Sequence, residues 1–215
     1  MFDAILFDFD GVLADTEPVH FECWREVLAG FDIYLEWSSF QHEFVGVSDW
    51  EMLERLGAAR KPPISAQELW PSYSHKRELF QARIAAQSPF EPATIDLIRQ
   101  LRGKYKLAVV SSSHRQEIEP PLVRAGMLPF LGALVCGNEV QNLKPAPEPY
   151  LRAAELLGAS KPLVIEDSDP GVASGRAAGF EVLRIPNASA LVASLNVFLR
   201  QNAPRGPTKF ALNSS

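Results

Sequence analysis

Two carboxylates, one residue apart, follow the first apolar run of the chain and are its clearest candidates for chemistry. Ala4–Phe7 is entirely apolar, and Asp8 and Asp10 come directly after it, on either side of Phe9. Carboxylates at positions i and i+2 of an extended chain lie on one side, so each raises the pKa of the other unless a cation lies between them. The pair indicates a nucleophile with a general acid–base, or a metal site. Taken alone, it is equally consistent with two acids in a turn or a helix cap.

Three consecutive hydroxyl side chains follow the next strongly apolar run. Ser111, Ser112 and Ser113 come directly after Leu107–Val110. A serine hydroxyl, together with backbone N–H groups at the start of a helix, can bind a phosphate group. Serine is also a very common helix N-cap, so the triplet alone favours the capping interpretation.

Lys144 stands in the segment LKPAPEP, in which three prolines stiffen the chain. A rigid loop holds the ammonium group in place with little loss of side-chain freedom, which suits a lysine that binds phosphate. On this segment alone, a solvated loop lysine is an equally good interpretation.

A second pair of acids follows a third apolar run. Glu166 and Asp167 come directly after Leu163–Ile165. Carboxylates are ligands for hard cations such as Mg²⁺, although Ser168 or Asp169 could instead cap a helix here. In combination, the two acidic pairs, the hydroxyls and the lysine predict one site for Mg²⁺ and a phosphate group.

The elements that must position these residues alternate between apolar runs and helical periods. This alternation predicts an α/β fold in which a parallel sheet is covered by helices on both faces. In such sheets the chemistry gathers at the carboxyl ends of the strands, where the candidate residues stand. The expected strands are 4–7, 107–110 and 163–165, with weaker candidates at 133–136 and 181–185, and the expected helices are 93–101, 149–157 and 171–178.

The stretch from residue 16 to residue 88 differs from the rest of the chain. It holds all four tryptophans and has no convincing buried strand. Its periods are helical, at residues 20–28, 49–56 and 67–85. We therefore expect residues 1–15 and 89–202 to form the core domain, residues 16–88 to form an inserted helical domain, and residues 203–215 to form a disordered tail.

The composition indicates a globular protein and excludes several functional classes. Of the 215 residues 47% are hydrophobic, and the net charge of −5 provides no basic surface for nucleic acid. No apolar run reaches the roughly 18 residues of a membrane span, and the first residues lack the basic start of a signal peptide. Cys23 and Cys136 are too few for a disulfide framework. We expect a cytoplasmic monomer that binds a small molecule, with neither a nucleic acid nor a membrane as partner.

These residues resemble the motifs of the haloacid dehalogenase-like hydrolases with a helical cap after the first motif, in the branch of the β-phosphoglucomutases and related phosphatases. The matches come in family order and at family spacing over about residues 3–186. The resemblance implies a doubly wound, Rossmann-like sheet with strand order 5-4-1-2-3 and an inserted α-helical cap. The matching segments are DFDGVLADTE from Asp8 for motif I, Ser111 for motif II, Lys144 in KPAPEPY for motif III, and Glu166-Asp167-Ser168 with Gly171 for motif IV.

The same resemblance implies a role for each matched residue. Asp8 would be the nucleophile that forms an aspartyl-phosphate, and Asp10 would protonate the leaving oxygen and then activate water. Ser111, Ser112 and Lys144 would hold the transferring phosphoryl group. An acid at position 10 argues against a dehalogenase, because a leaving halide needs no proton. The ligands of Mg²⁺ would be Asp8, Asp10 through its backbone carbonyl, Glu166 and Asp167.

In the cap, the resemblance singles out residues that would contact Asp10 or the substrate. His20 would orient Asp10 when the cap closes, with a histidine on a helix face as the alternative. Gly46 and Ser48 belong to a loop that would face the active site. The mutases of this branch carry an arginine for a second phosphate where this chain has Asp49, whose charge would repel that phosphate. Lys76 is a possible substitute clamp, although a solvated lysine on a helix face is the favoured interpretation.

We therefore expect a Mg²⁺-dependent phosphatase that hydrolyses a small phosphorylated metabolite, with a sugar phosphate as the favoured substrate. The first alternative is a phosphosugar mutase of the β-phosphoglucomutase type. The second is a non-catalytic protein that binds phosphorylated ligands, and the presence of Asp8, Asp10 and Lys144 argues against it.

Overall fold

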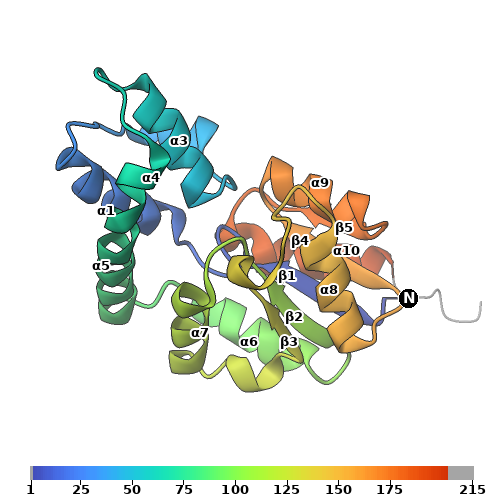
Figure 1. Ribbon diagram of the computed structural model, residues 1–215. Coiled ribbons are helices and arrows are strands. Elements are labelled where there is room, and N and C mark those ends of the chain that lie inside the picture. The colour runs from blue at the N-terminus through green and yellow to red at the C-terminus, as the bar shows by residue number, and fades with distance from the viewer. Residues whose placement is uncertain (1, 203–215) are drawn as a thin grey trace, which may run out of the picture.

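The computed structural model describes residues 2–202 and contains a five-stranded parallel sheet with strand order β3-β2-β1-β4-β5 (Figure 1). This is the expected α/β fold, and the order equals the expected 5-4-1-2-3 when it is read from the other edge. The expected tail at residues 203–215 lies outside the described residues. The strands are β1 (Ala4–Asp8), β2 (Lys106–Val110), β3 (Ala133–Val135), β4 (Pro162–Glu166) and β5 (Glu181–Arg184).

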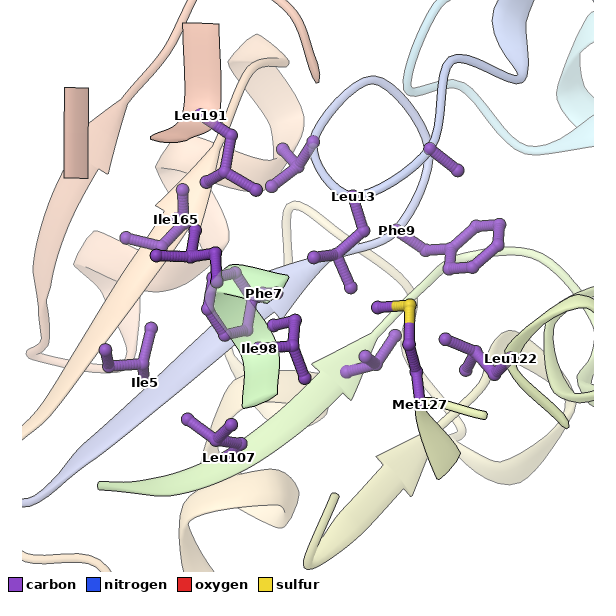
Figure 2. Close-up of a cluster of buried hydrophobic side chains, with 14 of the residues drawn as sticks. Ile5, Phe7, Phe9, Leu13, Ile98, Leu107, Leu122, Met127, Ile165 and Leu191 are labelled. Atoms are coloured by element: carbon purple, nitrogen blue, oxygen red, sulfur yellow. The ribbon is translucent and has the colours of Figure 1, made fainter. Parts of the chain in front are cut away.

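The central strand β1 is buried along its whole length, because helices cover both faces of the sheet. Ile5 and Phe7 belong to a core cluster on one face, together with Ile98 of helix α6 (Pro92–Leu101) and Leu191 of helix α10 (Leu191–Gln201) (Figure 2). Leu6 belongs to a cluster on the other face, which contains Tyr150 of helix α8. A strand with two apolar faces therefore reads as a continuous hydrophobic run, which made β1 predictable.

Helices α1 to α5 come one after another directly after β1 in the sequence, and the other helices lie around the sheet. Helices α8 and α9 lie on the sheet face opposite to α6 and α10. Among the described residues no helix is both long enough and apolar enough to cross a bilayer. The other helices are α1 (Glu17–Ala29), α2 (Trp37–Glu43), α3 (Asp49–Ala59), α4 (Ala66–Leu69), α5 (Tyr73–Ala86), α7 (Arg115–Arg124), α8 (Glu148–Leu157) and α9 (Asp169–Ala177), with short 3₁₀ turns at 70–72, 128–130, 137–139 and 188–190.

Helices α1 to α5 form a second body above the carboxyl ends of the strands, and we call it the cap (Figure 1). It has its own hydrophobic cluster, built around the fully buried Trp24 and Leu53. The chain leaves β1 for the cap and returns to the sheet through α6. The division into domains at residues 15/16 and 88/89 remains a prediction.

The structure differs in several places from the helices expected from the sequence. Helices α2 and α10 have no counterpart among them. The helix expected over residues 67–85 is interrupted by a 3₁₀ turn at Trp70–Ser72, which contains Pro71. Helix α7 has no counterpart among the expected helices, because it contains Pro120 and Pro121. In an α-helix the N–H of residue 120 would donate to the carbonyl of Gln116, four residues earlier, but Pro120 has no N–H. In the folded protein Gln81 of the cap donates a 2.9 Å hydrogen bond to that carbonyl instead.

Candidate active site

The sheet topology places the ends of β1, β2 and β4 side by side. Strand β1 lies between β2 and β4, and Asp8 is in register with Val110, the last residue of β2. Ser111 follows β2 directly, and Glu166 is the last residue of β4. Residues that are more than 100 positions apart in the sequence therefore meet at one edge of the sheet, as the rule for parallel sheets predicts.

Lys144 lies between the carboxylates of β1 and β4. Its Nζ donates hydrogen bonds to Asp8, to Glu166 Oε1 at 2.7 Å and to the carbonyl of Val110 at 3.1 Å. Burial alone would lower the pKa of Lys144, but the charges of Asp8 and Glu166 outweigh it and hold that pKa above its ordinary value. Lys144 is therefore a permanent positive charge beside Asp8, and the solvated interpretation of this lysine is wrong, since only 4% of its side chain is exposed.

Asp10 accepts hydrogen bonds on both of its carboxylate oxygens. Thr16 Oγ1 donates to Oδ1 at 2.5 Å, and His20 Nε2 lies 3.2 Å from the same oxygen. Ser111 and Ser113 donate to Oδ2, both at 3.2 Å. Burial alone would raise the pKa of Asp10, but the hydrogen bond and charge of His20, with the hydrogen bond of Thr16, lower it to about 2. Its carboxylate form is therefore strongly stabilised in this arrangement.

Three carboxylates at this edge of the sheet fit a divalent cation. Oxygen atoms of Asp8, Glu166 and Asp167 lie within 4.8 Å of one another. Burial and the charge of Glu166 raise the pKa of Asp167 to about 7, and burial raises that of Asp8 well above its ordinary value despite Lys144. Crowded oxygen ligands of this kind suit a hard cation such as Mg²⁺, which relieves their mutual repulsion.

The surroundings of these acids explain how they can approach one another. Gly11 has a φ of +76°, and a Cβ atom there would lie 2.1 Å from Asp167 Oδ2, so only glycine lets this carboxylate lie against the loop. Glu166 accepts hydrogen bonds on Oε1 from Lys144 and Tyr150, and on Oε2 from the N–H and hydroxyl groups of the loop after β4. Glu166 thus orients Lys144 and this loop, while its direct binding to a metal remains a prediction.

The serine triplet is divided between two positions. Ser111 is buried behind the pocket, where its Oγ donates to Asp10 and accepts from the N–H of Ser113. Ser112 and Ser113 line the pocket. The next helix, α7, begins at Arg115 with His114 as its N-cap, and His114 makes no side-chain capping bond. The helix-capping interpretation of the triplet is therefore wrong, while phosphate binding by Ser111 and Ser112 remains a prediction.

A pocket between the cap and the sheet edge brings most of the candidate residues together. Ser48 lines it, and its Oγ also caps helix α3 by accepting from the N–H of Glu51. Gly46 has a φ of +77° and packs against the loop after β4, where a Cβ atom would lie 2.9 Å from Ser168 Cβ. The lining residues are Asp8, Asp10, Glu17, His20, Trp24, Phe40, Phe44, Val45, Gly46, Val47, Ser48, Asp49, Met52, Ser112, Ser113, Lys144, Asp167 and Ser168.

The structure places two cap residues for which the sequence left alternatives open. His20 is buried and faces Asp10, so it is more than a histidine on a helix face. Lys76 is fully buried and bonded to Glu117 of the core, so the solvated interpretation of this lysine is wrong. The side chain of Lys76 is also absent from the lining of the pocket.

Four polar side chains at the site were given no individual role from the sequence. Thr16 and Ser113 bond Asp10, Tyr150 bonds Glu166, and Glu17 lines the pocket. Burial raises the pKa of Glu17 to about 8. All four lie within a few residues of a predicted site residue in the sequence. This closeness along the chain is the one sequence feature by which they could have been predicted.

Comparison with known proteins points to one family. The family model for haloacid dehalogenase-like hydrolases matches residues 2–179. The phosphorylated carbohydrates phosphatase of Thermotoga maritima is 30% identical, over 83% of this chain and 82% of that protein. The fructose-1-phosphate phosphatase of Escherichia coli is 26% identical, over 85% and 95% of the two chains. The structure is similar to that of CbbY from Rhodobacter sphaeroides in complex with xylulose-(1,5)bisphosphate, with a TM-score of 0.75, 26% identity and 87% of each chain covered.

Proposed function

The chain belongs to the haloacid dehalogenase-like hydrolases, and we propose that it is a Mg²⁺-dependent phosphatase that hydrolyses a small phosphorylated metabolite through an aspartyl-phosphate on Asp8. Relatives named as phosphatases support the reaction class. The observation that carries the proposal is the position of Asp8. Its carboxylate lines the pocket, is bonded by Lys144, and stands in one cluster with Asp167 and Glu166.

In the first step Asp8 attacks the phosphorus atom, and the bond from phosphorus to the leaving oxygen breaks. The transferring group is largely metaphosphate-like, so the protein contributes mainly positioning and charge neutralisation. Lys144 offsets negative charge on the phosphoryl oxygens, and the N–H and hydroxyl groups of the Ser111–Ser113 loop orient them. The negative charge of a bound phosphate ester raises the pKa of Asp10 above its value in the empty pocket, so Asp10 enters this step protonated. It gives that proton to the leaving oxygen, which departs as an alcohol.

In the second step a water molecule attacks the phosphorus of the aspartyl-phosphate. Asp10 takes a proton from this water, phosphate departs, and the carboxylate of Asp8 is restored. The hydrogen bonds of Thr16 and His20 to Oδ1 hold Asp10 in place through both steps. The hydroxyls of Ser111 and Ser113, which bond Oδ2 in the empty pocket, turn to the phosphoryl oxygens when substrate binds. Mg²⁺, held by Asp8, Asp167 and Glu166 with the backbone carbonyl of Asp10, would screen the nucleophile from the anionic substrate.

A sugar phosphate is the favoured substrate, because two relatives are named as phosphatases of phosphorylated carbohydrates and of fructose 1-phosphate. The presence of Asp49 in the pocket wall favours a phosphatase over a mutase, since a mutase must also bind a second phosphate. A monomeric state, a cytoplasmic location and the absence of nucleic-acid and membrane partners remain predictions.

The test is phosphate release from a panel of phosphorylated metabolites with Mg²⁺. A parallel assay measures the isomerisation of β-glucose 1-phosphate with and without glucose 1,6-bisphosphate. We expect phosphate release from a sugar monophosphate that stops when EDTA is added. Isomerisation that depends on the bisphosphate and releases little phosphate would identify a mutase, and ligand binding without turnover would identify a non-catalytic member; either result would contradict the proposal.

A further inference from the structure

A buried cluster of charges joins the cap to the core, outside the residues that the mechanism uses. Lys76 Nζ on α5 donates a 2.8 Å hydrogen bond to Glu117 Oε1 on α7, and both side chains are 0% exposed. Tyr73 Oη donates to the other oxygen of Glu117 at 2.7 Å. Lys76 Nζ also lies 3.5 Å from Asp49 Oδ2, at the start of α3. Removing two charges from water costs free energy, so the burial of this ion pair calls for a physical explanation.

Asp49 connects this cluster to the substrate pocket. Trp24 Nε1 donates a 2.7 Å hydrogen bond to Asp49 Oδ1, and both residues line the pocket. Lys76 lies behind them, with its Nζ 5.6 Å from the centre of the Trp24 ring. Asp49 therefore lines the pocket while its carboxylate oxygens accept from Trp24 and Lys76, and Lys76 itself does not line the pocket.

The charges of the cluster do not cancel. Burial alone would lower the pKa of Lys76, but the charges of Asp49 and Glu117 outweigh it and hold that pKa above its ordinary value, so the lysine stays protonated. One ammonium group thus faces two carboxylates. Among the cap residues described as lining the pocket there is no lysine or arginine. The polar side chains of this wall are Glu17, His20, Trp24, Ser48 and Asp49, and the others are mostly apolar.

We propose that Glu117 sets the substrate specificity of the pocket by neutralising Lys76. The carboxylate of Asp49 is then left to accept hydroxyl groups of an uncharged, polyhydroxy leaving group and to repel a second anionic group. Without Glu117, the positive charge of Lys76 would offset the negative charge of Asp49, and the repulsion of a second anionic group would be lost. This inference rests on the proposed phosphatase function and names the substrate class: phosphate monoesters of neutral polyols and sugars, in preference to bisphosphates and phosphorylated acids.

The experiment measures kcat/KM on substrate pairs that differ by one anionic group. Fructose 1-phosphate is compared with fructose 1,6-bisphosphate, and glycerol 2-phosphate with 2-phosphoglycerate. We expect the unmodified enzyme to prefer the member without the extra charge by at least tenfold. Glu117→Gln removes the neutralising charge and keeps the shape of the side chain, so we expect that preference to fall at least fivefold.

The control variant is Glu119→Gln, which removes the same charge from the same helix. Glu119 is partly exposed and is paired with Arg115, so the preference should not change. Because Glu117 is buried and its replacement could impair folding, Asp49→Asn provides a second test. A quarter of the Asp49 side chain is exposed, and asparagine can still accept from Trp24. We expect Asp49→Asn to reduce the preference as Glu117→Gln does.

The possible outcomes separate this inference from the proposed function. If Glu117 has only a structural role, Glu117→Gln lowers kcat/KM on both members of a pair in the same proportion, and the inference is wrong. Equal turnover of both members by the unmodified enzyme would overturn the inference and leave the phosphatase function intact. If no phosphate is released from any substrate, the proposed function is wrong and the inference is overturned with it.

Discussion

His20 Nε2 lies 3.2 Å from Asp10 Oδ1, although His20 belongs to a cap helix and Asp10 to the loop after the central strand. The ring of His20 is held in this position by stacking on Phe80 of α5, with 4.2 Å between the ring centres. The candidate acid–base is therefore oriented in part by the cap. Under the proposed mechanism, this contact lets the cap orient the acid–base Asp10.

Replacing His20 should lower turnover more than substrate binding. We expect His20→Ala to lower kcat roughly 10-fold with a small change in KM, because Asp10 loses a partner that orients it. His20→Gln, which keeps a donor of similar reach, should retain more of the activity. The measurement is steady-state kinetics on a sugar monophosphate, and an effect confined to KM would contradict the positioning role.

Asp8→Asn should abolish turnover and leave the fold intact, because an amide keeps the shape of the carboxylate but is a poor nucleophile. We expect a loss of kcat on the order of 10³ or more. Asp96→Asn, on the exposed side of α6, is the matched control and should behave as the unmodified enzyme. Substantial phosphatase activity in pure Asp8→Asn would rule out Asp8 as the nucleophile.

The effect of Asp10→Asn should depend on the leaving group. An aryl phosphate has a good leaving group that needs little protonation, whereas an alkyl phosphate needs a proton from the enzyme. We therefore expect a smaller loss of kcat with 4-nitrophenyl phosphate than with a sugar phosphate. Equal losses on both substrates would mean that Asp10 acts mainly in some other way than by acid catalysis.

Mg²⁺ should bind to and stabilise the protein even when no substrate is present. Asp8, Glu166 and Asp167 repel one another when no cation is bound, and a ligand that binds only the folded state raises its stability. We expect Mg²⁺ to raise the melting temperature, EDTA to reverse this rise, and Asp167→Asn to reduce it. The same melting temperature with Mg²⁺ and with EDTA would argue against the site.

The stability of the fold should depend on the ionisation of Asp3, which immediately precedes β1. Its carboxylate accepts hydrogen bonds from the N–H and hydroxyl of Ser160 and from the N–H of Lys161. Burial alone would raise the pKa of Asp3, but these hydrogen bonds outweigh it and hold that pKa below its ordinary value. The stabilisation is therefore present above the unfolded pKa of about 3.9 and is lost as the pH falls through the folded pKa.

Replacement of Asp3 measures this contribution. We expect Asp3→Ala to lower the free energy of unfolding by about 1 kcal/mol at pH 7. The effect should be smaller at pH 3, which lies below the unfolded pKa of about 3.9, because part of the stabilisation by the ionised carboxylate is lost there. Urea unfolding at the two pH values is the measurement. If Asp3→Ala lowers the free energy of unfolding by the same amount at pH 7 and at pH 3, the ionised form of Asp3 adds no stability.

The sequence predicted the parts of the fold that depend on local patterns. Strands β1, β2 and β4 are buried on both faces, so each is a continuous apolar run that can be recognised without any knowledge of its neighbours. Strand β5 is an edge strand with partly exposed residues, and its signal was correspondingly weaker. Helix α7 could not be predicted, because a proline pair ordinarily ends a helix and only the folded protein provides Gln81 for the freed carbonyl.

The sequence by itself also determined which residues stand at the strand ends, since Asp8, Ser111 and Glu166 each follow an apolar run directly. Only the tertiary structure decided how side chains from separate elements pair. It brought Lys76 to Glu117, 41 positions away, and placed Ser113 rather than Ser111 at the pocket. The physical reason is that hydrophobic periodicity encodes the local backbone and its buried face, whereas contact between two charged side chains depends on how whole elements pack against one another.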